Sequence, residues 1–207
     1  MPKFYKKDPE GRWDSTNADE YLWWPRILWI DPGVVSGVAV LWFDPKALFG
    51  GQPIPRAILG YSELFLYGPE DGLNGQVNRF LRLRRSLDQE PGLLTGCESF
   101  VIRKMSQDED FLAPVRIRAG IQSRMSVMKP LGEETIPEGG IPLYTQTPSD
   151  ALTTYKNSRL KDLGMYTPGP DHVNDAKRHA LLRLRKIQHA GVEKFQEQFG
   201  HEDEWFE

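Results

Sequence analysis

Residues 26–41 read RILWIDPGVVSGVAVL, and this stretch decides the fold because two apolar runs flank an aspartate, a proline and two glycines. The runs ILWI and GVAVLWF have the length and composition of buried strands. Only a short turn separates the two runs, which favours an antiparallel pair. The first strand nevertheless ends on the carboxylate of Asp31, and no basic residue lies beside it in the motif.

The segments that follow alternate between strand and helix patterns. Residues 56–67 predict a third strand, and residues 74–89 predict a helix because apolar residues recur there at helical spacing. Further strands are predicted at residues 97–102 and 141–148, and further helices at residues 113–128 and 174–191. The order β-β-β-α-β-α-β-α predicts an α/β fold, in which a mixed five-stranded sheet carries helices on both faces.

The length and composition indicate one domain with extensions. The chain has 207 residues, of which 39% are hydrophobic and 11% aromatic, so it has enough apolar side chains for one substantial core. We expect a polar N-terminal arm over residues 1–24, one domain over residues 25–191 and an acidic C-terminal tail over residues 192–207.

Charge, cysteine content and hydropathy point to a compartment. The formal net charge of −3 gives no global basic field, although a local basic face would be sufficient to bind nucleic acid. Cys97 is the single cysteine, which excludes an internal disulfide and favours a reducing compartment. No apolar run reaches the length of about 18 residues typical of a membrane span, and the N-terminus lacks the apolar segment of a secretion signal. These features predict a cytoplasmic protein without a membrane partner.

Acidic and imidazole side chains stand at strand ends and at the start of the last helix. Asp31 ends the first strand, and Glu98 lies among apolar neighbours in the fourth. The first and fourth strands are commonly neighbours in this topology, so the two carboxylates are expected side by side. His172 and Asp175 are three residues apart and share one face near a helix N-terminus. Because a lone buried carboxylate is costly, we expect a cation to pair with this set.

The predicted ligand set suits a hard divalent cation. Carboxylate-rich sets of this kind bind Mg²⁺ or Mn²⁺, and two such ions about 3.5–4 Å apart can hold a scissile phosphate and activate a water molecule. The sequence therefore predicts Asp31, Glu98, His172 and Asp175 as metal ligands and catalytic residues. An imidazole must be neutral to bind a metal, so activity is expected to fall between roughly pH 7 and pH 6.

Four segments, ILWIDPGVVSGVAVL, CESFVIRK, LAPVRIRAGI and HVNDAKRHALL, together resemble the RuvC branch of the ribonuclease H-like superfamily, especially the RuvC-like resolvases of bacteriophages. The family pattern has an Asp in I-D-P-G, a fourth-strand Glu followed shortly by Phe, and a His or acidic residue before Asp-Ala. Asp31, Glu98, His172 and Asp175 match these positions one by one. The resemblance covers about residues 26–191.

This resemblance implies a ribonuclease H-like fold and a divalent-metal endonuclease with two ions, Mg²⁺ or Mn²⁺, in each site. It also implies a homodimer that makes paired nicks in branched DNA such as the four-way junction. A phage-encoded protein of this kind would act in the cytoplasm of the host cell. An apolar stripe of Ile117, Ile121, Met125 and Met128 is a candidate dimer interface, with core packing as the alternative.

The basic residues that would contact DNA are unevenly placed. RuvC proteins usually carry a lysine-rich stretch before the last helix, where this chain offers only scattered basic residues. The last helix also carries Lys177, Arg178 and His179 where the family prefers small apolar residues. The candidates for phosphate contacts are Arg103, Lys104, Arg116, Arg118, Arg124, Lys156 and Lys161.

Several other functions are compatible with parts of the pattern. DPGVVSG also resembles the first phosphate loop of actin/hexokinase-like ATPases, but those proteins need a second, duplicated domain. An RNA-processing nuclease of the YqgF type would use the same metal chemistry, and a non-catalytic DNA-binding module could use the same fold. A zinc site built from His172, Asp175 and His179 is allowed by spacing, although the acidic residues favour a harder ion.

Overall fold

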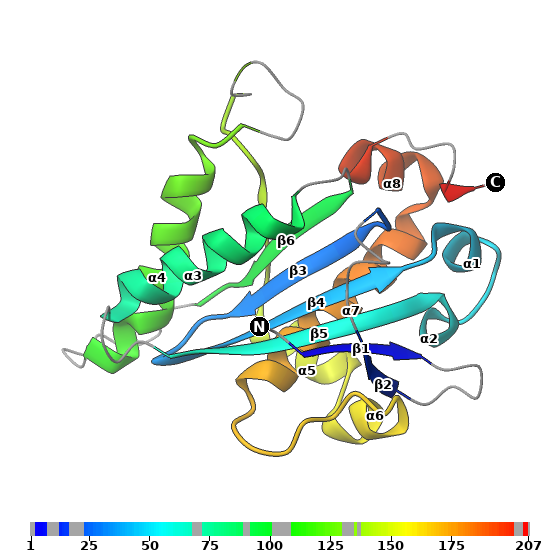
Figure 1. The fold of residues 1–207 in the computed structure, drawn as a ribbon, viewed down its shortest axis with the longest axis horizontal. Coiled ribbons are helices and arrows are strands. Elements are labelled where there is room, and N and C mark those ends of the chain that lie inside the picture. The colour runs from blue at the N-terminus through cyan, green and yellow to red at the C-terminus, as the bar shows by residue number, and fades with distance from the viewer. Residues whose placement is uncertain are drawn as a thin grey trace.

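The computed structural model describes residues 3–7, 13–16, 23–67, 72–88, 92–100, 109–129, 135, 138–200 and 205–206. In this part of the chain seven strands form one sheet in the order β2-β1-β5-β4-β3-β6-β7 (Figure 1). The strands are β1 (Lys3–Lys7), β2 (Trp13–Thr16), β3 (Arg26–Asp31), β4 (Val35–Phe43), β5 (Ile58–Tyr67), β6 (Leu93–Glu98) and β7 (Leu143–Gln146).

Helices cover both faces of this sheet. They are α1 (Pro45–Phe49), α2 (Ile54–Ala57), α3 (Gly72–Leu87), α4 (Glu109–Met125), α5 (Pro148–Thr154), α6 (Asn157–Asp162), α7 (His172–Ala190) and α8 (Val192–Phe199). Figure 1 shows α3 and α4 on one side of the sheet and α7 on the other. No helix in the described part of the chain is long and apolar enough to cross a membrane.

The mixed α/β architecture expected from the sequence is confirmed. β3 pairs antiparallel with β4 and parallel with β6, and β6 pairs parallel with β7. The expected five strands form the part β5-β4-β3-β6-β7 of the sheet. The strand number was wrong, because β1 and β2 extend the sheet beyond β5.

The boundaries of two elements also differ from expectation. β6 begins at Leu93 and ends at Glu98, whereas the sequence predicted a strand over residues 97–102, part of which lies outside the described residues. α4 begins at Glu109, four residues before the predicted start, and contains Pro114. Pro114 is the sixth residue of α4 and lies inside the helix, where it removes one backbone hydrogen bond because proline has no N–H group.

Alternate side chains of the central strands face two separate cores. Ile27 and Trp29 of β3 pack with α7 and α8, whereas Leu28 and Ile30 pack with α3 and α4. A central strand covered on both faces is apolar at every position, which explains the continuous run ILWI. This alternation also fixes the side of the sheet on which the last residue of each strand lies.

The stripe on α4 belongs to the second of these cores. Ile117, Ile121 and Met125 are fully buried against the sheet and α3. The interpretation of this stripe as a dimer interface is therefore wrong, and core packing accounts for it.

The C-terminal segment contributes to the first core. Phe195 and Phe199 of α8, and Trp205 beyond it, are buried there. Trp205 Nε1 donates a hydrogen bond to the carbonyl oxygen of Trp23 at 3.2 Å. The division of the chain into an arm, a domain and a tail stays a prediction.

Candidate active site

Asp31 and Glu98 are brought together by strand register. β3 and β6 run parallel, and the last pair in their ladder is Ile30 with Cys97. The next residues along the two strands are Asp31 and Glu98, at the carboxyl ends of both strands. Alternate residues of a strand lie on the same face of a sheet. Asp31 therefore lies on the face of Trp29, and Glu98 on the face of Leu94, so both carboxylates lie on the face covered by α7.

The N-terminus of α7 reaches the same edge because Gly37 has no side chain. Gly37 of β4 lies opposite Asp31 in the antiparallel ladder. A Cβ atom on Gly37 would lie 2.1 Å from the carbonyl carbon of His172, so only glycine allows α7 to approach the sheet this closely. This contact brings His172 and Asp175, in the first turn of α7, next to the end of β3.

All four predicted residues line one cavity of about 490 Å³. Its acidic and imidazole lining is Asp31, Glu98, His172 and Asp175, and its apolar lining includes Pro32, Val34, Phe100, Pro114, Pro148 and Leu152. The roles of the four residues stay a prediction, but their proximity is a property of the fold.

Each polar side chain of the cavity has a partner within the protein. His172 Nδ1 lies 2.7 Å from Asp31 Oδ2, and Asp175 accepts a hydrogen bond from Arg178. Glu98 accepts a hydrogen bond from His179 at 2.9 Å. Among the residues that the structure describes, no three acidic, histidine or cysteine side chains converge closely enough to hold a metal ion as they stand.

The electrostatics of the cavity nevertheless suit a cation. The pKa of Asp31 is raised to about 7, chiefly by burial; the hydrogen bond with His172 lowers it, and the Glu98 carboxylate raises it again. The hydrogen bond to Asp31 in turn raises the pKa of His172, against the effect of burial. Two carboxylates that oppose each other's ionisation gain stability from a divalent cation placed between them. The donor set therefore fits Mg²⁺ or Mn²⁺ in its chemistry.

A buried histidine lies beneath this cavity, at a position where the RuvC family pattern prefers a small apolar residue. His179 is 1% exposed and stacks on Trp29, with ring centroids 5.5 Å apart. Its Nδ1 lies 3.2 Å from Gln146 Oε1, while its Nε2 contacts Glu98. His179 therefore does not join His172 and Asp175, and a zinc site made of these three residues is not formed. The sequence contained one indication that His179 faces this cavity, because His179 lies four residues after Asp175 and therefore on the same face of the helix.

The predicted DNA-contacting residues that the structure describes lie on two sides of the sheet. Arg103 and Lys104 lie outside the described residues. Arg116, Arg118 and Arg124 come from α4 on one side of the sheet; Arg118 lines a cavity of about 240 Å³ next to Phe100, which also borders the acidic cavity. Lys156 and Lys161 are exposed around α6 on the other side, where the Lys161 ammonium lies 4.8 Å from the ring centre of Tyr166.

Two solved structures resemble this fold. They are Thermus thermophilus RuvC and T. thermophilus RuvC in complex with Holliday junction substrate, each with a TM-score of 0.49 and 15% sequence identity. The matches cover 76% of this chain and 91–92% of the RuvC chains. No protein-family model matches the sequence, and the search of curated proteins finds no match.

Proposed function

We propose that this protein is a divalent-metal-dependent endonuclease that hydrolyses phosphodiesters in branched DNA, such as four-way junctions. The observation that carries the proposal is the single cavity lined by Asp31, Glu98, His172 and Asp175. These residues come from two strand ends and one helix, so tertiary contacts bring them together. The RuvC-like sequence pattern assigns the same residues to metal binding.

The protein's own residues would hold the cations and orient the phosphate. Asp31 and Glu98 would provide carboxylate oxygens from the sheet, and His172 and Asp175 would provide a nitrogen and an oxygen from α7. Two bound Mg²⁺ or Mn²⁺ ions would supply Lewis acidity at the scissile phosphate and lower the pKa of a water molecule. To act as ligands, Asp31 must lose its proton and Asp175 must turn from Arg178.

The remaining walls of the cavity suit the organic part of a nucleotide. Val34 and Leu152 are large apolar side chains that are 49% and 54% exposed, and both border the cavity. Exposed apolar side chains next to an acidic cluster would contact sugars or unstacked bases, which are accessible at the branch point of a junction. Because a four-way junction has approximate two-fold symmetry, we expect a homodimer to cut it.

The deciding experiment offers the purified protein labelled four-way junction, replication fork, linear duplex and RNA of matched sequence. Each substrate is incubated with Mg²⁺, Mn²⁺ or EDTA, and Asp31→Asn is the control for contaminating nucleases. We expect metal-dependent cuts near the branch point and none from Asp31→Asn. Preferential cutting of RNA would favour the YqgF-like alternative. Tight junction binding without cleavage in either metal would favour a non-catalytic DNA-binding module.

A further inference from the structure

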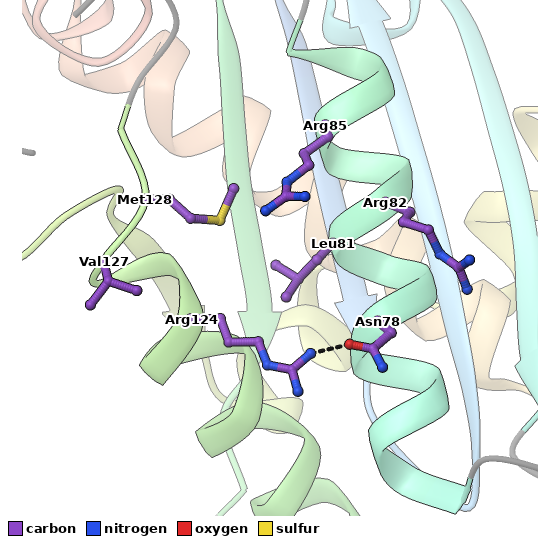
Figure 2. Close-up of a pocket in the computed structure, with 7 residues that line it drawn as sticks. All are labelled: Asn78, Leu81, Arg82, Arg85, Arg124, Val127 and Met128. Atoms are coloured by element: carbon purple, nitrogen blue, oxygen red, sulfur yellow. Dashed lines mark hydrogen bonds between the residues drawn. The ribbon is translucent and has the colours of Figure 1, made fainter. Parts of the chain in front are cut away.

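A second cavity, of about 510 Å³, lies between α3 and α4. Its polar lining consists of Asn78, Arg82 and Arg85 from α3 and Arg124 from α4, and no acidic residue borders it in the described part of the chain. Figure 2 shows Arg124 reaching across to Asn78 and Arg85 pointing into the gap between the two helices, whereas Arg82 extends toward the other side of α3. The cavity therefore gathers guanidinium groups from two elements.

No described acidic residue neutralises the positive charge of this cavity. α3 contains no Asp or Glu in its 16 residues, and the buried Arg84 pairs with Asp88 at 2.8 Å. Arg82 and Arg85 are exposed and have no acidic partner among the described residues. Since the whole chain carries a net charge of −3, these guanidinium groups form a local basic site on a mildly acidic protein. Such a site attracts anions.

The geometry and the apolar lining of the cavity favour a phosphodiester over a simple ion. Arg124 donates a hydrogen bond to Asn78, which holds its guanidinium in place and leaves its remaining N–H groups for a ligand. Guanidinium forks match the spacing of phosphate oxygens. Leu81 and Met128 border the same cavity and would contact a sugar, whereas an inorganic anion gains nothing from apolar surface.

The cavity is separate from the acidic one. α3 and α4 pack on the core that contains Leu28 and Ile30, whereas Asp31 and Glu98 lie on the opposite face, against α7. A ligand between α3 and α4 would therefore not compete for the predicted metal ligands.

We propose that the cavity between α3 and α4 binds a backbone phosphodiester of the nucleic acid substrate through Arg85 and Arg124, with Arg82 bordering the site. This inference rests on the proposed nuclease function and adds a contact away from the cleavage cavity. It implies that only substrates long enough to reach both cavities gain affinity from it.

The test measures binding of a labelled four-way junction by fluorescence anisotropy in EDTA, where no cleavage occurs. The variants are Arg82→Gln/Arg85→Gln and Arg124→Gln, compared with Arg185→Gln/Lys186→Gln, which removes the same charge from the exposed side of α7. We expect the first double variant to bind at least ~10-fold more weakly at about 0.1 M salt. Its salt slope should fall by about 1, because the proposed ligand is a single phosphodiester and each phosphate that the protein no longer neutralises accounts for about 0.9 of the slope. Arg124→Gln should also weaken binding and lower the slope by no more than about 1, and the α7 variant should change little.

A second measurement uses the unmodified protein. Phenylglyoxal labels accessible arginines, and mass spectrometry locates the label. Junction DNA should protect the arginines of the cavity, whereas dTMP at the same phosphate concentration should not. Protection by dTMP would identify a mononucleotide site and overturn the proposal.

The outcomes separate this inference from the proposed function. If the wild-type protein cleaves junctions but the cavity and α7 variants bind DNA equally well, only the α3–α4 phosphate site is refuted. If the wild-type protein neither binds nor cleaves branched DNA, both the site and the nuclease function are refuted.

Discussion

His179 Nε2 lies 2.9 Å from Glu98 Oε2, beneath the acidic cavity and sealed from solvent. The ring of His179 rests on Trp29, and the ring of Trp29 in turn lies over Gly96 of β6, where a Cβ atom would be 2.1 Å from it. Gly96 therefore lets Trp29 support His179, and His179 in turn fixes one oxygen of Glu98. Histidine–carboxylate contacts of this kind orient metal ligands in many proteins.

The first prediction concerns this contact. His179→Phe keeps a ring against Trp29 but removes the hydrogen-bond donor, so Glu98 loses its orientation. Mn²⁺ affinity, measured by calorimetry without substrate, should fall about 10–100-fold. His179→Gln places an amide N–H near the position of Nε2 and should recover most of the affinity. If the phenylalanine variant is folded and binds Mn²⁺ as tightly as wild type, Glu98 does not depend on His179.

The second prediction links the predicted metal site to stability. The pKa of Asp31 is about 7 in the folded protein, compared with an ordinary value of 3.8, so the folded state keeps a proton that the unfolded chain releases. The stability of the metal-free protein should therefore fall as pH rises from about 4 to about 7. Asp31→Asn removes this cost, which is on the order of 4 kcal/mol at most, while abolishing cleavage.

Urea unfolding in EDTA at pH 4 and pH 8 checks this prediction. Wild type and Asp31→Asn should be similar at pH 4, and the variant should be the more stable protein at pH 8. If Asp31→Asn is less stable than wild type at both pH values, Asp31 stabilises the fold through its packing, and its burial does not carry the electrostatic cost described above.

The third prediction concerns the pH dependence of metal binding. Since the pKa values of both Asp31 and His172 are raised, the pair retains a proton near neutrality that a metal ion must displace. Apparent Mn²⁺ affinity should therefore increase with pH and level off above about 7. The hydrogen bond from His172 lowers the pKa of Asp31, so His172→Asn should move this midpoint to higher pH. Calorimetric titrations from pH 5.5 to pH 8.5 measure it, and an unchanged midpoint would show that the pair does not control binding.

The fourth prediction concerns Gly37. In Gly37→Ala the new methyl group would overlap the backbone of His172, so the first turn of α7 must move away from β4. We expect a loss of about 1–3 kcal/mol in unfolding free energy and a large loss of cleavage. Gly120→Ala is the matched control, because the nearest atom to its methyl group would belong to the side chain of Val77, at 3.1 Å, and not to the backbone. Near-normal cleavage by Gly37→Ala would contradict the close approach of α7.

The fifth prediction concerns the buried ammonium group of Lys177. Its Nζ donates to the carbonyl oxygen of Met165 at 2.6 Å and to Thr167 Oγ1 at 2.7 Å, and it pairs with Glu63. Lys177→Met leaves Glu63 without its cation and should cost about 3–5 kcal/mol of unfolding free energy. Adding Glu63→Gln should recover part of that loss in a double-mutant cycle. Additive effects of the two substitutions would mean that the pair contributes no coupling.

The sequence by itself determined the architecture around the predicted site. The continuous apolar runs of residues 27–30 and 37–43 predict strands covered on both faces, and the periodic pattern of residues 174–191 predicts the helix that covers them. Element order then made the first and fourth strands neighbours. These properties follow from local patterns of apolar side chains, because positions that are buried on either face of the sheet are occupied by apolar residues. For the same reason the four residues of the acidic cavity could be named in advance.

Only the tertiary structure decided which side chains surround that cavity. The partner of Glu98 is His179, 81 residues later in the chain. The helical spacing of His179 from Asp175 indicates the face on which it lies, but not this contact. Residues 3–7 and 13–16 have weak strand patterns. Residues 3–7 become a strand because the edge of β5 offers unpaired backbone groups, and residues 13–16 pair in turn with the edge of β1. Lys177, Arg178 and His179 are residues of a kind usually found at the surface, yet all three are buried, because the sheet covers one side of α7 while α5 and α6 pack on another. Burial of charged groups is decided by the partners that the fold supplies, and these partners come from distant segments of the chain.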